Sequence, residues 1–569
     1  MPAVVVFVAV MAIFALAYRY YAAYLADRVY ALDPDFVTPA HEFEDGVDYV
    51  PTNKHVLFGH HFTSVAGAAP IVGPAIAVVW GWAPALLWIT LGTVFAAGVH
   101  DTGALVVSVR NKATNIGTLA QTVINPRSRT LFLAIIFFLL TLVNAVFAIV
   151  IGTLFEANPA AVIPIVAEIP LAIFIGQYIH RTRTSALVPS IVGVVTLYLL
   201  IIVGIQFPID LSGVAEAIGM SARTLWIILL FIYGWIASRI PVWVLLQPRD
   251  YINSHQLFIA LTVIFLGVLI GMDTIDAPAF NAVEGARNWF PFLFVTIACG
   301  AVSGFHSLVS SGTTSKQLDK DTDARYIGYV GALGEGSLAL GAELATTAGI
   351  GIVGSDWSAQ YPDFATASSG ALGNFTQGVA GFASNIGIPL SYGTVFAAVV
   401  VVSFAATTLD TGIRLQRYII QEIGDILRND TLAKNITLTT TLAVLFPFAL
   451  ALAPAGGDGD TLAFGRLWTL FGTTNQLTAG LALAVIAVWV TKNGRNAMAQ
   501  IIPLTFLLFM TVWALIINLR EFVADGDWLL APLDLAIFAL AVWLIIEAVL
   551  AIRAARAGVR ASGTPTAPR

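Results

Sequence analysis

Uncharged apolar runs long enough to cross a bilayer recur along the chain. Residues 130–153, "TLFLAIIFFLLTLVNAVFAIVIGT", hold no charged residue over 24 positions, and about 20 apolar residues suffice for a transmembrane helix. Over the whole chain 58% of the residues are hydrophobic and 11% are charged, whereas an ordinary soluble domain has about 25% charged residues. The sequence therefore predicts an all-α polytopic membrane protein and excludes a water-soluble one.

Hydropathy divides the chain into about fifteen expected transmembrane helices. They fall near residues 3–20, 57–81, 83–109, 130–153, 160–179, 187–206, 223–246, 256–273, 290–313, 327–354, 390–412, 435–454, 466–490, 499–518 and 531–552. The first run has no basic residue before its apolar core, so it is expected to be a retained span and not a signal peptide. No connection is long enough for a globular domain, and the function is expected to lie within the bilayer.

Positive charge collects in every second connection. The loops on one side hold 23 of the 28 Lys and Arg residues, and the opposite loops hold only four. Because cytoplasmic loops are rich in Lys and Arg, the N-terminus is expected outside the cytoplasmic (inner) membrane and the C-terminus in the cytoplasm. The basic tail 553–569 is expected to be disordered and to contact anionic lipid. The lipid bilayer is thus an expected partner, and nucleic acid is not.

The predicted span 57–81 contains Gly67, Pro70, Gly73 and Pro74 within eight residues. Proline removes backbone donors, and free backbone groups at membrane depth are tolerable only where they line a cavity or contact protein. Two interpretations are open, a proline kink or a discontinuous helix of the kind that forms substrate and ion sites in secondary transporters. The close spacing of the glycines and prolines favours the discontinuous helix.

Arg239 falls about halfway along the predicted span 223–246 and is soon followed by Pro241. An arginine at the centre of a membrane costs at least about 2.5 kcal/mol and needs a partner. Two roles are open for it. It is either a fork that holds a substrate carboxylate or a permanent ion-pair partner of Asp101, Glu335 or another buried acid.

Five further ionisable residues lie inside predicted spans: His100, Asp101, His306, Glu335 and Glu343. Ionisable groups are rare in a bilayer and often serve transport, which makes each of them a candidate proton relay. Hydrogen bonding between helices is an equally good explanation for any one of them.

Polar residues around His306 share one face of the expected helix. Ser303, His306, Ser307, Ser310 and Thr314 recur at three- and four-residue steps, which places them in one stripe. The stripe is either ordinary hydrogen-bonded packing or part of an ion path.

Other polar residues receive structural interpretations. Asp410 and Arg414 have the i, i+4 spacing of an exposed ion pair. Asn475 and Gln476 are expected to join helices by hydrogen bonds. Arg249–Asp250 falls at the predicted cytoplasmic rim, where the two residues are expected to be structural or to belong to a gate.

Neither an enzyme nor a bound cofactor is expected. His60 and His61 are adjacent, so on a helix they point about 100° apart and do not form the same-face pair of a metalloprotease. The chain contains no HExxH, GxSxG or GxxxxGK motif. Its single cysteine, Cys299, excludes a multi-cysteine metal site and is expected to be a buried, inert thiol.

Five sequence blocks carry a family resemblance. They are "YVPTNKHVLFGHHFTSVAGAAPIVGP", "SRIPVWVLLQPRDY", "FPFLFVTIACGAVSGFHSLVSSGTT", "SFAATTLDTGIRLQRYI" and "LFGTTNQLTAGLAL". In sequence and order they closely resemble blocks of the carbon-starvation protein A family, over roughly residues 48–490. The resemblance implies an inner-membrane transporter that takes up peptides or pyruvate when carbon is scarce, usually coupled to protons. This chain has "VHDT" at 99–102 where the family has "VQDF", so the resemblance gives His100 no role of its own.

The resemblance also implies a fold of the amino acid, polyamine and cation superfamily, with two five-helix repeats of inverted topology. The expected parts are an N-terminal helix and cytoplasmic linker (1–55), a first repeat (56–206), a second repeat (215–415), four additional helices (430–552) and the tail (553–569). This scheme pairs 57–81 with 223–246. It also makes 290–313 the third helix of the second repeat, whose small hydroxyls in similar folds contribute to a cation site.

These expectations combine into one hypothesis, a secondary active importer of peptides or pyruvate that works by alternating access. Substrate binding is assigned to residues at or near the break: His61, Gly67, Ala68, Gly73 and Arg239. Coupling to a proton, or to sodium, is assigned to polar groups on three segments: Asp101, His306, Ser310, Thr313, Thr314 and Glu335. The alternative is a passive channel or a starvation sensor without active transport. The sequence selects neither the substrate, nor the coupling ion, nor an oligomeric state.

Overall fold

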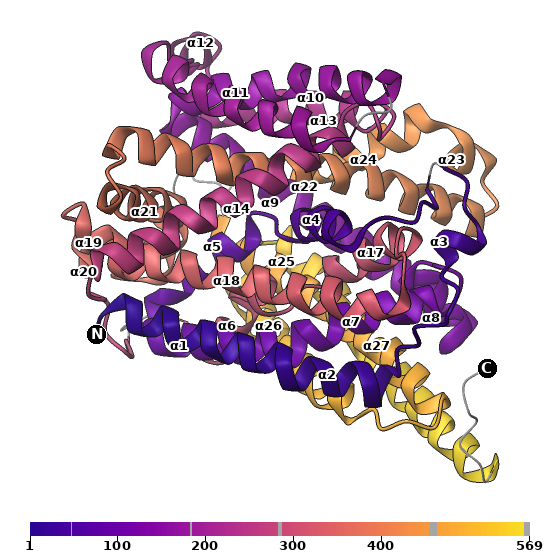
Figure 1. The fold of residues 1–569 in the computed structure, drawn as a ribbon. Coiled ribbons are helices and arrows are strands. Elements are labelled where there is room, and N and C mark those ends of the chain that lie inside the picture. Colours follow the sequence, from indigo (N-terminus) through magenta and orange to yellow (C-terminus); the bar gives the residue numbers. More distant parts are fainter. Residues whose placement is uncertain (47, 183–184, 283–286, 454–463, 563–569) are drawn as a thin grey trace.

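The chain is helical throughout the part that the structure describes. The computed structural model (Figure 1) covers residues 1–46, 48–182, 185–282, 287–453 and 464–562, and within these ranges helices are joined by short connections without any β-strand. The all-α prediction is confirmed.

Ten of the described helices are long and apolar enough to cross a membrane. They are α1 to η2 (Ala3–Tyr30), α6 to α7 (Trp82–Val109), α9 (Pro126–Ala157), η5 to α10 (Pro159–Thr182), α11 (Leu187–Gln206), α14 (Leu246–Gly271), α22 (Leu390–Ile426), α25 (Phe464–Lys492), α26 (Met498–Ala524) and α27 (Leu530–Ser562). An eleventh candidate is the pair α4 (Lys54–Val65) and α5 (Ala69–Ala77), which is bent by 51°. The protein is a multi-pass membrane protein, and the predicted count of about fifteen spans is not confirmed, since ten or eleven candidates pass this test among the described residues.

Four predicted spans account for the difference. Segments 223–246 and 435–454 form only the short helices α13 (Ala222–Ala237) and α24 (Ile436–Ala451). Segment 290–313 is divided into α15 (Trp289–Thr296), α16 (Ala298–Ala301) and α17 (Gly304–Gly312). Segment 327–354 lies in a helical run whose glycines and two glutamates lower its hydropathy, made of η8 (Arg325–Val330), α18 (Gly331–Leu344), η9 (Ala345–Gly349) and α19 (Ile350–Ile352).

Short helices occupy the connections: α3 (Pro39–Glu42), α8 (Ile116–Val123), α12 (Ser212–Ala217), α20 (Trp357–Gln360) and α23 (Asp430–Lys434). The predicted disordered tail begins too early, because α27 continues to Ser562. Residues 563–569 of that tail lie outside the described residues.

One long helix, α21 (Phe364–Asn385), lies in a segment that the sequence predicted to be a connection. Its many Gly, Ala, Ser and Thr residues give it too little hydropathy to be recognised. The same small residues let it pack backbone to backbone against η9. A Cβ at Gly378 would collide with the carbonyl oxygen of Ala345, and one at Gly349 would lie 2.5 Å from the carbonyl oxygen of Gly378. Small residues join helices in membranes in this way.

Substituting Gly378 with alanine should therefore destabilise the protein. The new methyl group would meet backbone, which cannot rotate away, and overpacking of this kind costs about 1–3 kcal/mol. Gly373 is the matched control, since it lies on α21 with nothing within 4 Å of an added Cβ. Thermal unfolding in detergent should show a lower Tm for Gly378→Ala and an unchanged or higher Tm for Gly373→Ala. Equal Tm values for the two variants would contradict the close contact.

Helices α9, α22 and α25 form the centre of the bundle. Of the most apolar window in each, 83%, 83% and 94% is buried inside the protein, against 22% for α27. Figure 1 shows α25 behind α4 and α5, with α1 along the lower edge. An apolar helix that is not covered by protein must face lipid, so α1 and α27 belong to the periphery.

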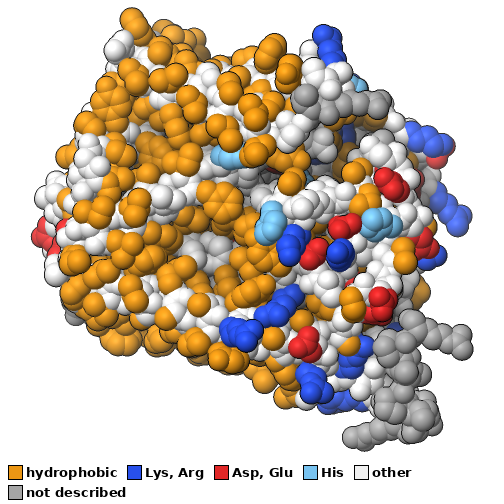
Figure 2. Space-filling view, in the orientation of Figure 1, with side chains coloured by type: hydrophobic (Ala, Val, Ile, Leu, Met, Phe, Trp, Pro, Cys, Tyr) orange, Lys and Arg blue, Asp and Glu red, His pale blue; other side chains and the backbone are white. Residues whose placement is uncertain are grey.

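Charged side chains gather at one end of the molecule. Figure 2 shows Lys, Arg, Asp and Glu side chains around α3 and α23, while hydrophobic side chains cover most of the rest of this face. A membrane protein with its positive loops on one side has this appearance. The sidedness of the two termini stays a prediction.

Candidate functional site

Two helical segments are interrupted in the interior of the protein. Between α4 and α5 the backbone leaves the helix at Ala66, with φ −79° and ψ 77°. Between α16 and α17, Val302 (φ −169°, ψ 128°) and Ser303 (φ −125°, ψ 129°) are extended. These residues are all buried. Unwound backbone at membrane depth is stable only where it contacts protein or lines a cavity, so both interruptions are candidate site elements.

The predicted discontinuity of 57–81 is confirmed, but it is shorter than expected. The non-helical residues are 66–68, which include Gly67 and Ala68, whereas Gly73 lies inside α5. Gly73 packs against the second interrupted segment, because a Cβ there would lie 2.5 Å from the carbonyl oxygen of Thr296. In this conformation Gly73 brings the two segments together and does not line the pocket between them.

A small pocket lies where the two interruptions meet. Its walls come from both interruptions and from the helices beside them: Val65, Gly67, Ala69, Pro70, Val143, Phe147, Cys299, Ser303, Phe305, Glu335, Thr408 and Phe471. Its volume of about 20 Å³ leaves room for about one water molecule. Most of the lining is apolar, and a carboxyl, two hydroxyls and a thiol supply its polar side chains. The free space between the two interruptions is therefore small in this conformation.

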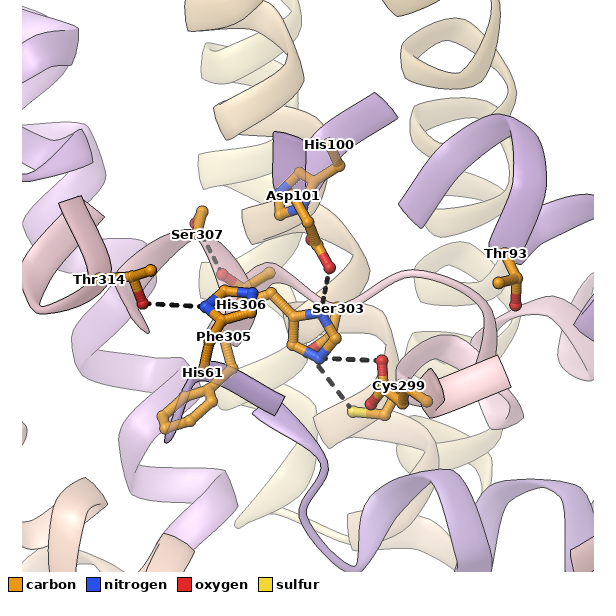
Figure 3. A network of polar contacts seen from close by, with 12 residues as sticks. His61, Thr93, His100, Asp101, Cys299, Ser303, Phe305, His306, Ser307 and Thr314 are labelled. Atoms are coloured by element: carbon orange, nitrogen blue, oxygen red, sulfur yellow. Dashed lines mark hydrogen bonds and ion pairs between the residues drawn. The ribbon is translucent and has the colours of Figure 1, made fainter. Parts of the chain in front are cut away.

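A chain of buried acids and histidines runs from the protein interior to this pocket. Asp101 of α7 lies between two imidazoles, with its Oδ1 2.7 Å from His100 Nδ1 and its Oδ2 2.8 Å from His306 Nδ1. The Nε2 of His306 lies 3.0 Å from Glu335 Oε2 of α18. Figure 3 shows Asp101 pointing at His306, with Ser303 and Cys299 beside it. The Oε1 of Glu335 has no hydrogen-bond partner among the described residues, and Glu335 lines the pocket.

This chain of contacts is suited to holding and moving protons. With Asp101 and Glu335 both ionised and the histidines neutral, two negative charges would be buried together, which is costly. A proton held by any member of the group would reduce this excess charge. Asp101 contacts both histidines within hydrogen-bond distance, and His306 Nε2 lies 3.0 Å from Glu335 without a hydrogen bond in this conformation, so a small movement would complete a proton path from the pocket wall to Asp101.

The hydroxyls after His306 divide into two groups. Thr314 is buried, and its Oγ1 lies 2.9 Å from Nδ1 of His61, on α4 just before the first interruption (Figure 3). Ser310 is also buried, and its Oγ has no partner among the described residues. Thr313 is exposed and donates to the carbonyl oxygen of Val309. Thus Thr314 and His61 connect the two interrupted segments, and Thr313 faces away from them.

Asn475 of α25 stabilises the non-helical backbone of the second interruption. Its Oδ1 accepts a hydrogen bond from the backbone N–H of Phe305 at 3.2 Å, and its Nδ2 lies 3.2 Å from Ser303 Oγ and 2.9 Å from Cys299 Sγ. The predicted role of Asn475 in joining helices is confirmed, and Gln476 likewise donates to the carbonyl oxygen of Leu507. Sequence reasoning missed that Cys299 lines the pocket, although its place in a block rich in Gly and Ser was a usable signal.

Thr408 is a pocket residue that the sequence did not indicate. It lies on α22, and a Cβ added to Gly67 would come within 2.9 Å of its Oγ1. The Thr408 hydroxyl donates a hydrogen bond to the carbonyl oxygen of Phe404, one turn earlier in α22. The pair of threonines in "AATTLD" was the available signal, but hydroxyls bonded to their own helix are common in membrane spans.

Arg239 is not the buried arginine that the sequence predicted. It follows the end of α13, is exposed, stacks on Trp235 and donates to Thr437 Oγ1 at 2.9 Å. Of the two roles left open for Arg239, pairing with Asp101 or Glu335 does not occur in this structure, because both acids contact His306 instead. Its role as a carboxylate fork stays a prediction. The helix ends early since a residue before proline, here Ile240 before Pro241, disfavours helical geometry.

The buried arginine is Arg249, which the sequence placed at the rim. It is 1% exposed and forms ion pairs with Glu168 at 3.3 Å and with Asp410 at 2.8 Å. The predicted exposed pair of Asp410 with Arg414 is therefore also wrong. Arg414 instead donates to the carbonyl oxygens of Ala237 and Ile240.

Truncation of Arg239 should have little effect on transport. Because Arg239 is exposed and makes no ion pair in the described structure, Arg239→Ala should leave substrate uptake within about twofold of wild type, a change of under ~0.5 kcal/mol typical of surface sites. Radiolabelled uptake by whole cells, normalised to the amount of protein in the membrane, measures this. Loss of uptake at normal protein levels would restore Arg239 as a substrate ligand.

No cluster of three or more His, Cys, Asp and Glu side chains suited to a metal ion occurs among the residues that the structure describes. The acids and histidines of the site form a linear chain of contacts from His100 through Asp101 and His306 to Glu335. The arrangement therefore offers proton-binding groups beside a closed pocket.

Comparison with protein families gives one match. A family model described as "Carbon starvation protein CstA" matches residues 2–351 and 357–514. This range includes both interruptions, the pocket and the chain of acids and histidines.

Several characterised proteins are similar over most of their length. The peptide transporter CstA of Escherichia coli K12 is 33% identical over 568 residues, covering 89% of this chain and 80% of the relative. The pyruvate/proton symporter BtsT of the same organism is 32% identical over 587 residues, with the same coverage of 89% and 80%. The peptide transporter CstA of Bacillus subtilis 168 is 31% identical over 552 residues, covering 90% of each chain.

Two solved structures align over most of the chain at low similarity. MhsT in complex with L-phenylalanine has 13% identity and a TM-score of 0.47, covering 88% of this chain and 99% of its own. A mutant manganese transporter of Eremococcus coleocola has 13% identity and a TM-score of 0.43, covering 90% and 99%.

Proposed function

The chain belongs to the carbon starvation protein CstA family, and on this premise we propose that it is a secondary active importer of short peptides or pyruvate, driven by protons. The named activities of its relatives, peptide transport and pyruvate/proton symport, supply the substrate class. The family resemblance inferred from the five sequence blocks is thereby confirmed. The proposed location is the cytoplasmic membrane, with the N-terminus outside.

The observation that carries the proposal is the position of Glu335. Its side chain lines the pocket between the two interruptions and also contacts His306, which contacts Asp101. Glu335 contacts both the pocket and the chain of His306 and Asp101. Binding of substrate in the pocket can therefore change the protonation of this chain, and protonation can change the affinity for substrate. Such a link is a coupling free energy between two ligands, typically about 1–3 kcal/mol.

The two interrupted segments fit an inverted-repeat transporter. On the predicted alternation of positive loops, which counts α13 as one crossing, α4–α5 begins in the cytoplasm and α15–α17 begins outside, so the two segments run in opposite directions. Substrate sites at the interface of inverted repeats are formed by discontinuous helices of this kind. We therefore pair α4–α5 with α15–α17 as equivalent elements of the two repeats, in place of the pairing with the segment 223–246.

The small volume of the pocket means that the protein must change conformation to bind substrate. A space for about one water cannot hold pyruvate or a dipeptide, so binding of either requires the interrupted segments to move apart. The unwound backbone at Gly67 and Ala68 and the hydroxyls of Ser303 and Thr408 would then face the substrate carboxylate. Pyruvate, the smaller molecule, requires less opening.

Uptake by the purified protein in liposomes tests the function. Pyruvate and dipeptides are offered in turn under an inward proton gradient, an inward sodium gradient or no gradient. We expect accumulation above the external concentration of at least one substrate under the proton gradient only. Accumulation under sodium alone would change the coupling ion, and equilibration without accumulation would indicate a passive channel.

A further inference from the structure

A second cluster of buried charges lies on the side of α22 that faces α10 and α14. Its centre is Arg249, which lies between Glu168 at 3.3 Å and Asp410 at 2.8 Å, with all three side chains no more than 1% exposed. One cation thus faces two carboxylates. With both acids ionised, the three residues together carry an excess negative charge.

Among the described residues, no second cation forms an ion pair with the carboxylates of this triad. The hydroxyl of Tyr233 donates to Asp410 Oδ2 at 2.7 Å, and that of Ser403 donates to Glu168 Oε2 at 3.1 Å. The neighbouring Arg414 and Arg417 of α22 donate to backbone carbonyls at the end of α13. The two carboxylates are therefore stabilised by hydrogen bonds from hydroxyls, and Arg414 acts on Asp410 only from a distance, without an ion pair among the described residues.

Asp250 and His60 lie next to the triad. Asp250 follows Arg249 in α14, and its Oδ2 lies 3.7 Å from Nδ1 of His60 on α4. Its Oδ1 is buried and has no partner among the residues that the structure describes. The side chains of His60 and Asp250 are 18% and 12% exposed, so the pair is partly exposed whereas the triad is buried.

The negative charge of the triad favours a bound proton on His60 or Asp250. An ionised Asp250 next to a neutral His60 would add a second excess negative charge to the cluster, and buried charge of one sign is unfavourable. A proton on either residue removes that excess, as a neutral carboxyl or as an imidazolium paired with a carboxylate. We propose that the His60–Asp250 pair binds one exchangeable proton and forms a second coupling site, separate from the chain of Asp101, His306 and Glu335.

The pair is placed to respond to opening of the pocket. His60 lies on α4, the first half of the interrupted helix, and Asp250 lies on the unbroken helix α14. One turn further along α14, Asn253 donates to Thr407 Oγ1 at 2.7 Å, and the adjacent Thr408 lines the pocket. Movement of α4 away from α14 would separate the pair and admit water to Asp250. The inference rests on the proposed function, since it adds one proton to the same transport cycle.

Coupling stoichiometry in liposomes tests the inference. With the membrane potential clamped at zero by potassium and valinomycin, each co-transported proton multiplies the steady-state accumulation ratio about tenfold per unit of pH gradient, as 1.4 kcal/mol is tenfold. We expect Asp250→Asn to lower the ratio for pyruvate or a dipeptide about tenfold at a gradient of one pH unit, with exchange of labelled for unlabelled substrate retained. Asp425→Asn, which removes an exposed carboxylate from the end of α22, is the matched control and should keep the wild-type ratio.

The outcomes separate the two proposals. A wild-type ratio in Asp250→Asn would overturn the second site alone. Absence of proton-driven accumulation by the wild type would overturn the proposed function and this inference with it. If Asp250→Asn fails to fold, His60→Asn is used. It should shift the pH of half-maximal substrate exchange, and an unchanged pH profile in a folded His60→Asn protein would overturn the inference.

Discussion

Replacing Glu335 with glutamine is expected to abolish proton-driven accumulation while exchange of labelled substrate across the membrane continues. Glutamine has nearly the same shape and can still contact His306, but it cannot bind or release a proton. The pocket and the two interruptions would be preserved, and only the link between the pocket and the buried proton store would be lost. Since such coupling is typically worth about 5–150-fold, the accumulation ratio should fall at least about fivefold.

Glu343→Gln is the matched control for this variant. Glu343 lies two turns along the same helix and is also buried, but it does not line the pocket, and its side-chain oxygens have no partner among the described residues. Proteoliposome assays of accumulation and of exchange should separate the two variants, with accumulation lost only in Glu335→Gln. Accumulation by Glu335→Gln at the wild-type level would show that the coupling proton does not pass through this carboxyl.

Replacing Arg249 with methionine should cause the largest loss of stability. The substitution leaves Glu168 and Asp410 buried without their cation, and removal of one partner from a buried ion pair costs about 3–5 kcal/mol. The aliphatic side chain of methionine fills much of the same space, so the loss would come from charge and not from a cavity. Thermal unfolding in detergent should show a large decrease in Tm.

A combined variant identifies the cause of that loss. Adding Glu168→Gln and Asp410→Asn to Arg249→Met removes both uncompensated charges while keeping the shapes of the side chains. Neutral replacements of whole buried charge networks are often tolerated, so the triple variant should recover much of the lost Tm. A triple variant no more stable than Arg249→Met would mean that Arg249 acts through its other hydrogen bond, to Tyr233.

The sequence predicts the membrane class and the first interruption because both depend on local composition. Apolar runs identify most of the spans, and the close spacing of glycines and prolines over residues 67–74 marks the segment that contains the break at Gly67. The second interruption is harder to predict, since Val302 and Ser303 lie in a stretch with no nearby proline that would break a helix. There the long-range contact of Asn475 with Phe305 replaces the helical hydrogen bonds.

The acids and histidines of the site were identified singly, but their grouping was not predicted. His306 and Asp101 are 205 positions apart, and hydropathy says which ionisable residues lie within the membrane but not which of them meet. The two arginines show the same limitation. Arg239 and Arg249 lie in one predicted block, and only the position of the end of α13 decides which of them is buried.

Substrate-induced proton movement is the most direct test of the central claim that occupancy of the pocket is coupled to protonation of the chain from Glu335 to Asp101. Wild-type protein is placed in liposomes containing a pH indicator, without any ion gradient, and pyruvate or a dipeptide is added outside. Acidification of the lumen that follows substrate addition, and that is absent from Glu335→Gln liposomes, is the predicted result. Substrate entry with no change in luminal pH in the wild type would contradict the account.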